Sequence, residues 1–387
     1  MKKIFSVIML VIALSLCAIT NIESLDVNAA PSDDVSSSSA YLMDYNSKTV
    51  IFAKGENKRL TIASMTKIML LNLCFEKLDE GEFTLEDEIT ISKNASGMGG
   101  SQVFLESGKS YKAGDLIKSI IVASANDASV AMAERLFGSE QACVDIMNEK
   151  CTEWGLTDTL FSNCTGLPKP TQYSCAKDVA TMLTHLLSHK EYFNYSNIWM
   201  DEIEHEGGRT TGLTNTNKLI RFYDGCDGGK TGYTQESGFC LAATAKRGAM
   251  RLIAVIIKAK DGKTRFAEAS SLFNYGFENY TEKMVVDSSK PLDITVSIEN
   301  GREDKVPVRP LNDIYIFSER NKKDKITVDF VPEKKIVAPI KEGDVVGKLT
   351  VFKDNIEFSS VDVVSLSDID KKTYFDYIKD ISKKWQI

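Results

Sequence analysis

Three short strings dominate this sequence: SMTK at residues 64–67, SAN at residues 124–126 and KTG at residues 230–232. In this order they supply two serine hydroxyls, two lysine amines, an asparagine amide and a threonine–glycine pair. No histidine belongs to the set, although histidine is the side chain that most often acts as a base. The strings therefore indicate a site in which a lysine takes that part.

The first string pairs Ser64 with Lys67 at the head of an apolar run that predicts a helix over residues 61–78. Residues three apart in a helix share a face, so the Lys67 amine can lie beside the Ser64 hydroxyl. A lysine can activate a serine only when burial or a nearby cation lowers its pKa, and Lys230 is a candidate for that cation. The free N–H groups of a helix N-terminus would also favour a developing oxyanion.

The second string lies in a largely apolar stretch that predicts buried helix over residues 116–136, interrupted near Asn126 and Asp127. Ser124 can relay a proton towards a leaving amine, and Asn126 can hold a substrate amide. These two side chains would complete a proton path that begins at the lysine.

The third string lies in a predicted strand, residues 229–234. On an edge strand, Thr231 and Gly232 would allow close backbone approach and β-type pairing with an extended peptide. Lys230 could then pair with a carboxylate of that peptide.

Because short motifs also occur by chance, any single string is weak evidence for a function. S-x-x-K is expected about once or twice in a chain of this length, and SCAK at residues 174–177 is a second copy. A second S-x-N, SKN at residues 92–94, precedes a glycine-rich segment. KTG is expected on the order of a tenth of a time and occurs once. The helical settings and the order along the chain favour the copies at residues 64 and 124.

The surrounding pattern predicts α+β layers rather than alternating parallel units, because helices stand between a leading hairpin and a later run of strands. The hairpin is predicted over residues 41–44 and 49–53 with a turn at 45–48, further helices over 178–187 and 264–275, and adjacent strands over 229–234, 238–245 and 251–258.

Over residues 40–280 the chain resembles serine-type D-alanyl-D-alanine carboxypeptidases, which are low-molecular-mass penicillin-binding proteins. The blocks that carry the resemblance are ASMTKIM, GGSQVFLESG, ASANDASVAMAE, FSNCTGLP and DGGKTGYTQESGFCLAATA. The resemblance implies a transpeptidase-like α+β fold, an antiparallel sheet with helices plus an all-helical part, followed by a small all-β domain. It implies no cofactor and no metal.

The resemblance also implies the reaction. An acyl-enzyme would form on Ser64 as the terminal D-alanine leaves a peptidoglycan stem peptide ending in D-Ala-D-Ala, and water would then hydrolyse it. β-Lactam antibiotics would block the same serine covalently. The implied oxyanion hole is the backbone N–H groups of Ser64 and Tyr233, and Arg265 matches a family arginine near the substrate carboxylate. SAN departs from the S-D-N of class A β-lactamases, but these carboxypeptidases accept a variable middle residue.

The C-terminal third has a different composition. Residues 284–364 predict a small β-rich domain, with strand-like runs at 294–296, 314–317 and 325–328 and a turn at 341–344. Residues 367–387 predict an amphipathic helix with one apolar face: Tyr374, Phe375, Ile378, Ile381 and Trp385. This face can lie in a membrane interface or dock on the β-rich domain.

The N-terminus predicts export. Lys2 and Lys3 precede an apolar run at residues 4–19 and small residues at 27–29, which together indicate a signal peptide over residues 1–30. The run is short for a membrane span. The mature chain would act at the extracytoplasmic face of a bacterial cell, secreted or peripherally attached to the membrane, in cell-wall biogenesis. Residues 31–39 predict a disordered polar leader.

Charge, cysteines and histidines argue against several other kinds of protein or site. The net charge of −7 disfavours nucleic-acid binding. Seven cysteines follow the signal peptide; buried free thiols are expected, although Cys143 with Cys151, or Cys164 with Cys175, could pair. His185 and His189 share a predicted helical face without the H-E-x-x-H zinc signature.

Two other functions share the same strings. A β-lactamase needs a well-placed base for deacylation, and residues 162–168 carry no acid where one is expected. A non-catalytic peptidoglycan-binding scaffold would have no need to retain both Ser64 and Lys67.

Overall fold

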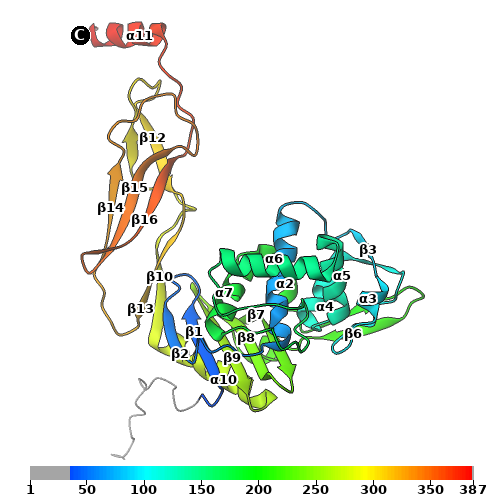
Figure 1. Ribbon diagram of the computed structural model, residues 1–387. Coiled ribbons are helices and arrows are strands. Elements are labelled where there is room, and N and C mark those ends of the chain that lie inside the picture. The colour runs from blue at the N-terminus through cyan, green and yellow to red at the C-terminus, as the bar shows by residue number, and fades with distance from the viewer. Residues whose placement is uncertain (1–34, 386–387) are drawn as a thin grey trace, which may run out of the picture.

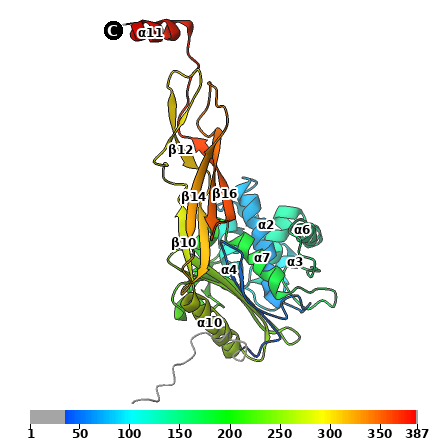
Figure 2. The ribbon, with the colours of Figure 1, turned by 90° about the vertical axis from the view of Figure 1, so that its left-hand side faces the viewer.

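The computed structural model describes residues 35–385, so the predicted signal peptide lies outside the described residues. Helices and a central sheet form one part of the molecule, and an elongated β-rich part stands beside it (Figure 1). A view from the side shows the β-rich part extending away from the sheet, with the last helix at its far end (Figure 2).

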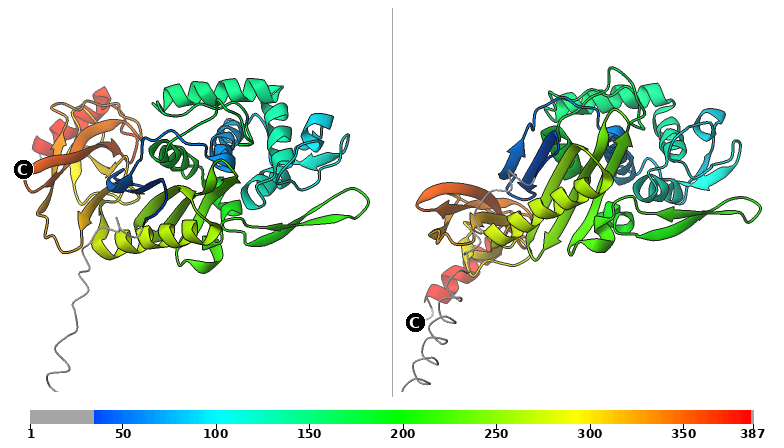
Figure 3. Two further views of the ribbon diagram at one scale, coloured as in Figure 1. Left: turned by 60° about the horizontal axis from the view of Figure 1, so that its bottom comes forward. Right: turned by 90° about the horizontal axis from the view of Figure 1, so that it is seen from below.

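The central sheet has five antiparallel strands in the order β2 (Val50–Lys54), β1 (Ser39–Asp44), β9 (Met250–Ala259), β8 (Gly238–Arg247) and β7 (Cys226–Thr234). Successive side chains of β9 point to opposite faces of the sheet, so they pack alternately into two separate hydrophobic cores, one on each face. Helix α10 (Gly262–Asn279) covers one face together with the short α9 (Leu219–Phe222), and most of the other helices cover the opposite face (Figure 3). Strand β7 ends this order, so one of its edges has no neighbouring strand among the described residues.

The helices opposite α10 form the larger core. They are η1 (Ala63–Thr66), α2 (Lys67–Asp79), α3 (Lys93–Ser96), α4 (Ala113–Val122), α5 (Asn126–Phe137), α6 (Glu140–Glu153), α7 (Ala176–Leu186), η2 (Lys190–Tyr192) and α8 (Phe193–Ser196). Two short hairpins join them: β3 (Glu88–Thr90) with β4 (Ser110–Lys112), and β5 (Met200–Glu204) with β6 (Thr210–Thr214). Helix α2 is apolar almost all round and is buried from Lys67 to Phe75, which fits its place between α5, α6 and α7. The prediction of α+β layers is confirmed.

The β-rich part has its own core of valine, isoleucine and leucine side chains. Its larger sheet runs β11 (Thr295–Ser297), β12 (Lys305–Pro310), β16 (Ile356–Ser365), β15 (Val345–Lys353) and β14 (Ile326–Pro332). Strand β10 (Tyr280–Val286) pairs with β13 (Ile314–Glu319) and joins this part to the central sheet. The three predicted strand-like runs lie in or beside β11, β13 and β14.

The prediction of a disordered leader over residues 31–39 is wrong for residues 35–39. Val35 is buried, and β1 already begins at Ser39. The N–H and hydroxyl of Ser36 both donate to the buried Glu268 carboxylate on α10, each at 2.7 Å, and Ser37 donates to it as well. A buried carboxylate needs such donors, so it orders this polar segment.

The last helix is shorter than predicted, since α11 spans Tyr374–Trp385 and residues 367–373 are not helical. It begins at Tyr374 because the N–H and hydroxyl of Thr373 bind the Asp376 carboxylate, at 2.8 and 2.7 Å. Tyr374 and Phe375 are 76% and 79% exposed, so docking of this face on the β-rich domain was the wrong alternative. Among the described residues no helix is long and apolar enough to span a membrane.

The cysteines behave as expected from composition. The seven that lie in the described part of the chain, from Cys74 to Cys240, are free and buried. Neither of the two possible disulfides forms.

A buried carboxyl pair joins the two parts of the molecule. Asp44 at the end of β1 is fully buried, and Glu282 in β10 is 8% exposed. Asn46 donates to Glu282 Oε2 (2.8 Å), and Ser47 donates to Asp44 Oδ2. Asp44 Oδ1 and Glu282 Oε1 have no hydrogen-bond partner among the described residues. Burial, followed by the charge of Asp44, raises the pKa of Glu282 to about 7.

This pair predicts pH-dependent stability. Because the folded pKa of Glu282 exceeds its usual 4.5, its contribution is complete below about pH 4.5 and is lost as the pH rises through about 7. Glu282→Gln removes the titration and offers an amide N–H to Asp44 at every pH. From about pH 5.5 to about pH 8.5 we expect the wild type to lose about 1 kcal/mol relative to this variant, allowing for solvent screening. Urea-unfolding midpoints measure the difference.

Glu357→Gln is the matched control, since Glu357 is exposed on β16. Parallel pH profiles for the wild type and Glu282→Gln would contradict the prediction.

Candidate active site

The structure brings Lys67 and Ser64 together at the start of the buried helix. Ser64 lies in η1, one turn before α2, and Lys67 Nζ is 3.0 Å from Ser64 Oγ. The same nitrogen is 2.6 Å from Asn126 Oδ1 and 2.7 Å from the Thr165 carbonyl oxygen. Asn126 Oδ1 and the carbonyl can only accept hydrogen bonds, so they take the two N–H groups of a neutral amine. Its lone pair is then left for the Ser64 proton.

Lys67 is fully buried, and this burial lowers its pKa to about 7. Lys230 is also buried, and burial lowers its pKa too, with the charges of Lys67 and Arg265 as smaller causes. Burial alone lowers the pKa of Lys67, and Lys230 is not among the groups that shift it, so the prediction that Lys230 supplies the cation for this shift is not supported.

Ser124 lies in the break between α4 and α5. The predicted interruption near Asn126 and Asp127 falls slightly earlier, since α5 begins at Asn126. Ser124 has a left-handed backbone (φ 64°), and its hydroxyl accepts a hydrogen bond from Lys230 Nζ at 2.8 Å. A hydroxyl therefore stands next to each lysine amine, Ser64 beside Lys67 and Ser124 beside Lys230.

The KTG strand lies directly against the serine turn. A Cβ atom on Gly232 would stand 2.5 Å from the Ile62 carbonyl oxygen and 3.3 Å from the Ser64 nitrogen. Only glycine allows β7 to approach this closely. Thr231 donates its hydroxyl hydrogen to Thr216 Oγ1 (2.8 Å), which connects β7 to the segment before α9.

Thr165 and Gly166 were not predicted as site residues, although both lie in the FSNCTGLP block. The Thr165 carbonyl accepts from Lys67. Gly166 has φ +81°, and a Cβ there would stand 2.0 Å from the Ala63 carbonyl oxygen. Asn163 Oδ1 accepts the Gly166 N–H (2.7 Å) and fixes this turn. A backbone carbonyl carries no residue-type signal, so no sequence pattern could have assigned the Thr165 contact.

Asp127 is a further residue beside the site that was not predicted. Its buried carboxylate accepts the backbone N–H groups of Val103 and Leu105, each at 3.1 Å, and that of Ala128 at 2.9 Å. Its neighbour Asn126 donates its side-chain amide to the Gly99 carbonyl (2.6 Å). The sequence feature that could have revealed Asp127 is an acid in the first turn of a predicted helix, where the helix dipole favours a carboxylate.

The two residues assigned from the resemblance lie beside β7. Arg265 donates to the carbonyl oxygens of Gly232 (3.0 Å) and Cys240 (3.1 Å), so in this structure it supports the KTG strand from α10. Tyr233 follows Gly232 on the edge strand, and its side chain is 57% exposed and packs on Phe239.

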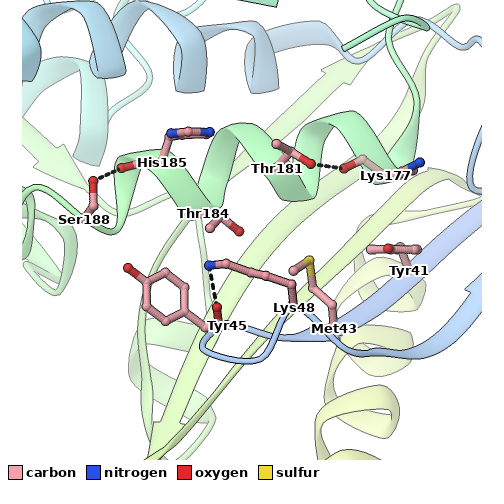
Figure 4. A pocket seen from close by; sticks show the side chains of 9 residues that line it. All are labelled: Tyr41, Met43, Tyr45, Lys48, Lys177, Thr181, Thr184, His185 and Ser188. Atoms are coloured by element: carbon pink, nitrogen blue, oxygen red, sulfur yellow. Dashed lines mark hydrogen bonds between the residues drawn. The ribbon is translucent and has the colours of Figure 1, made fainter. Parts of the chain in front are cut away.

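The second copies of the strings have structural uses elsewhere. Ser92 caps α3 by accepting the Ala95 N–H. Ser174 is buried and its hydroxyl bonds to Thr159, whereas Lys177 lines a groove of about 470 Å³ between α7 and β1 (Figure 4). Neither copy has a lysine amine next to its serine hydroxyl, which agrees with the preference for residues 64 and 124.

The two histidines predicted to share a helical face have other contacts, and only His185 lies in a helix, because α7 ends at Leu186. His185 stacks on Trp154 with ring centroids 3.9 Å apart, and His189 Nδ1 lies 2.6 Å from Asp79 Oδ2. Among the described residues no group of three or more His, Cys, Asp or Glu side chains could hold a metal ion.

Comparison with known proteins agrees with this geometry. The family model described as D-alanyl-D-alanine carboxypeptidase matches residues 26–261, and that of the penicillin-binding protein 5 C-terminal domain matches residues 280–371. The chain is 35% identical to D-alanyl-D-alanine carboxypeptidase DacF of Bacillus subtilis over 348 residues, 90% of this chain and 89% of the relative. It is 30% identical to DacA of Haemophilus influenzae, with 86% and 85% covered.

Solved structures show the same relationship. A peptidoglycan synthesis regulatory factor (PBP3) from Streptococcus pneumoniae superimposes with a TM-score of 0.71 at 26% identity, covering 87% of this chain and 100% of that one. Penicillin-binding protein 5 from Haemophilus influenzae gives 0.69 at 28% identity, covering 87% and 98%. The predicted transpeptidase-like fold with an added β domain is confirmed. The chain belongs to the serine-type D-alanyl-D-alanine carboxypeptidases, the low-molecular-mass penicillin-binding proteins.

Proposed function

We propose that this enzyme removes the terminal D-alanine from peptidoglycan stem peptides through an acyl-enzyme on Ser64, with Lys67 as the general base. The observation that carries the proposal is the buried Lys67 amine, 3.0 Å from Ser64 Oγ and held by Asn126 and Thr165. Neutral Lys67 takes the Ser64 proton as the serine oxygen attacks the carbonyl carbon of the penultimate D-alanine.

The proton that Lys67 has taken then passes, with the Ser124 hydroxyl as relay, to the leaving amine of the terminal D-alanine. Lys230 Nζ, 2.8 Å from the Ser124 hydroxyl, holds this relay in place. The peptide lies along the free edge of β7 at Thr231 and Gly232, and Asn126 holds its amide. The N–H groups of Ser64 and Tyr233 stabilise the oxyanion. Lys230 pairs with the terminal carboxylate, whose arrival raises the pKa of the lysine again. Arg265 contributes to this positive end of the site through the strand that it supports.

The hydrogen-bond partners of Lys67 support a carboxypeptidase rather than a β-lactamase. Within residues 35–385, the three hydrogen-bond partners of Lys67 Nζ are a hydroxyl, an amide oxygen and a carbonyl oxygen. The penicillin acyl-enzyme should therefore lack an efficient base for hydrolysis and persist.

Ser64→Ala tests the nucleophile. We expect D-alanine release from a peptide ending in D-Ala-D-Ala to fall by about 10³-fold or more, to background, and a fluorescent penicillin to leave no adduct. Release is measured by coupled D-alanine oxidation and the adduct by gel fluorescence. Ser174→Ala, in the second S-x-x-K copy, is the matched control and should keep both activities.

The same assays separate the alternatives. Rapid turnover of the penicillin would favour a β-lactamase. A wild-type protein with neither an adduct nor D-alanine release would favour a non-catalytic scaffold and overturn the proposal.

The pKa of Lys67 gives a second test. Since the amine is neutral only above about pH 7, the rate of penicillin acylation should rise as the pH increases through about 7 and level off above it. Lys67→Arg should lower that rate by about 100-fold or more at every pH, because a guanidinium stays protonated. Stopped-flow fluorescence measures the rate, with Lys177→Arg as control. A flat profile with full activity in Lys67→Arg would rule out this base.

We also propose an extracytoplasmic location in cell-wall biogenesis, after removal of a signal peptide over residues 1–30. Residues 40–280 would form the catalytic domain and residues 284–364 a β-rich domain that carries α11. Phe375, Ile378 and Ile381 on α11 are 79%, 45% and 57% exposed, which fits a helix that lies in a membrane interface.

Membrane contact can be tested on the intact chain. Replacing Phe375 and Ile378 by serine should lower co-sedimentation with lipid vesicles by about tenfold, because burial of the apolar face drives interfacial binding. Val331→Ser, which removes a 62% exposed valine of β14, is the control and should change nothing. Equal sedimentation of all three proteins would exclude a membrane role for this face.

A further inference from the structure

The side-chain amide of Asn126 suits the active site in only one of its two orientations. Its Oδ1 accepts from Lys67 Nζ at 2.6 Å, and its Nδ2 donates to the Gly99 carbonyl oxygen at 2.6 Å. Rotated by half a turn, the amide would set its oxygen against the Gly99 oxygen and direct an N–H at Lys67. That N–H would occupy the lone pair of the amine, which has to receive the Ser64 proton. The position of the Gly99 carbonyl therefore decides whether Lys67 is available as a base.

The chain around Gly99 has little stiffness of its own. Residues 97–109 form neither helix nor strand, and three of the first four are glycines: Gly97, Gly99 and Gly100. Glycine allows a wider range of backbone angles than any other residue, and Gly100 uses that range with φ +79°. A Cβ atom on Gly100 would stand 2.8 Å from Asn126 Nδ2, so this segment lies directly against the amide. Contacts from outside the segment must hold it there.

The first two residues of α5 hold the segment. The Asn126 N–H donates to the Ser101 carbonyl at 2.7 Å. The Asp127 carboxylate accepts the N–H groups of Val103 and Leu105, each at 3.1 Å. Three hydrogen bonds therefore fasten this segment to the start of α5.

Asp127 depends on these donors in turn, because it is only 1% exposed. The partners of its carboxylate within residues 35–385 are the backbone N–H groups of Val103, Leu105 and Ala128, and no cation is among them. A buried carboxylate without donors is strongly destabilised, and an N–H bond to a charged acceptor is about twice as strong as one between neutral groups. The carboxylate and the segment therefore hold each other in place.

We propose that Asp127 is a positioning residue for the general base. Its carboxylate holds residues 103 and 105, and through them the Gly99 carbonyl. That carbonyl in turn keeps Asn126 Oδ1 directed at Lys67. This inference rests on the proposed function, which gives Asn126 and Lys67 their parts in the reaction. Asp127 acts on the reaction only through Asn126.

Asp127→Asn tests this inference. The new amide has the size of the carboxylate but only one acceptor oxygen, and its NH2 group would face an N–H of the segment. We expect the plateau rate of penicillin acylation, measured by stopped-flow fluorescence above about pH 8, to fall about tenfold. Asp127→Ser is made alongside, because the first turn of a helix tolerates serine, and should give a similar loss.

Asp178→Asn is the matched control. Asp178 is also a buried acid in the first turn of a helix, α7, and accepts the Asp158 N–H at 3.0 Å. Because it makes no contact with the segment or with Asn126, its replacement should leave the acylation rate within about twofold of the wild type.

Two readouts separate positioning from a general loss of structure. In enzyme that already carries Asn126→Ala, Asp127→Asn should lower the rate by less than about twofold, because the group through which it acts is gone. The second readout is the pH midpoint of acylation. Burial lowers the pKa of Lys67, and Cys164 and Asp127 act in the opposite direction. The midpoint should therefore move below about pH 7 in Asp127→Asn and stay in place in Asp178→Asn.

An unchanged rate in both Asp127 variants, an unchanged midpoint, or equal losses with and without Asn126 would overturn this inference. Each of these results would leave the reaction of Ser64 with Lys67 as its base intact. A wild-type enzyme that forms no penicillin adduct would overturn the proposed function, and this inference with it.

Discussion

The active site depends on the cost of burying the Lys67 amine. An ammonium without solvent is unstable, so burial favours the neutral form and brings its pKa to about 7. Two acceptor oxygens, from Asn126 and Thr165, satisfy the amine without supplying a negative charge that would restore the ammonium. A carboxylate in either place would raise the pKa and leave Ser64 without a base. The neutral partners are therefore as important to the proposed chemistry as the lysine itself.

Close backbone packing holds the serine turn in place in front of the buried Lys67. Gly166 and Gly232 both pack against residues 62–64 at distances that no Cβ would permit, one from the loop that carries Thr165 and one from β7. The serine turn is thus held between two glycines, while α2 behind it is buried from Lys67 to Phe75. The price of this rigidity is local strain at Ala63, Ser124 and Phe104, which the surrounding hydrogen bonds maintain.

Much of this was predictable, because the information lies in residue types and periods. The hairpin at the N-terminus, the helix behind Ser64, and strands β7, β8 and β9 follow from apolar patterns, and the i,i+3 spacing predicts the Ser64–Lys67 contact. Contacts through the backbone were not predictable. The Thr165 carbonyl and the Asp127 clamp on Val103 and Leu105 depend on how distant segments meet. The buried Glu268 that orders residues 36 and 37 lies more than 230 positions away in the sequence. The polar composition of residues 31–39 carries no sign of this distant partner, so it led to the wrong prediction of disorder for residues 35–39.

The most direct test of the central claim is the protonation state of Lys67 itself. Lysine labelled with ¹³C at Cε allows the Lys67 resonance, assigned through Lys67→Arg, to be followed against pH in the free enzyme. A titration midpoint near pH 7 is the result that burial of the amine predicts. A midpoint above about pH 10, the ordinary range of an exposed lysine, would contradict the proposal that a neutral Lys67 activates Ser64.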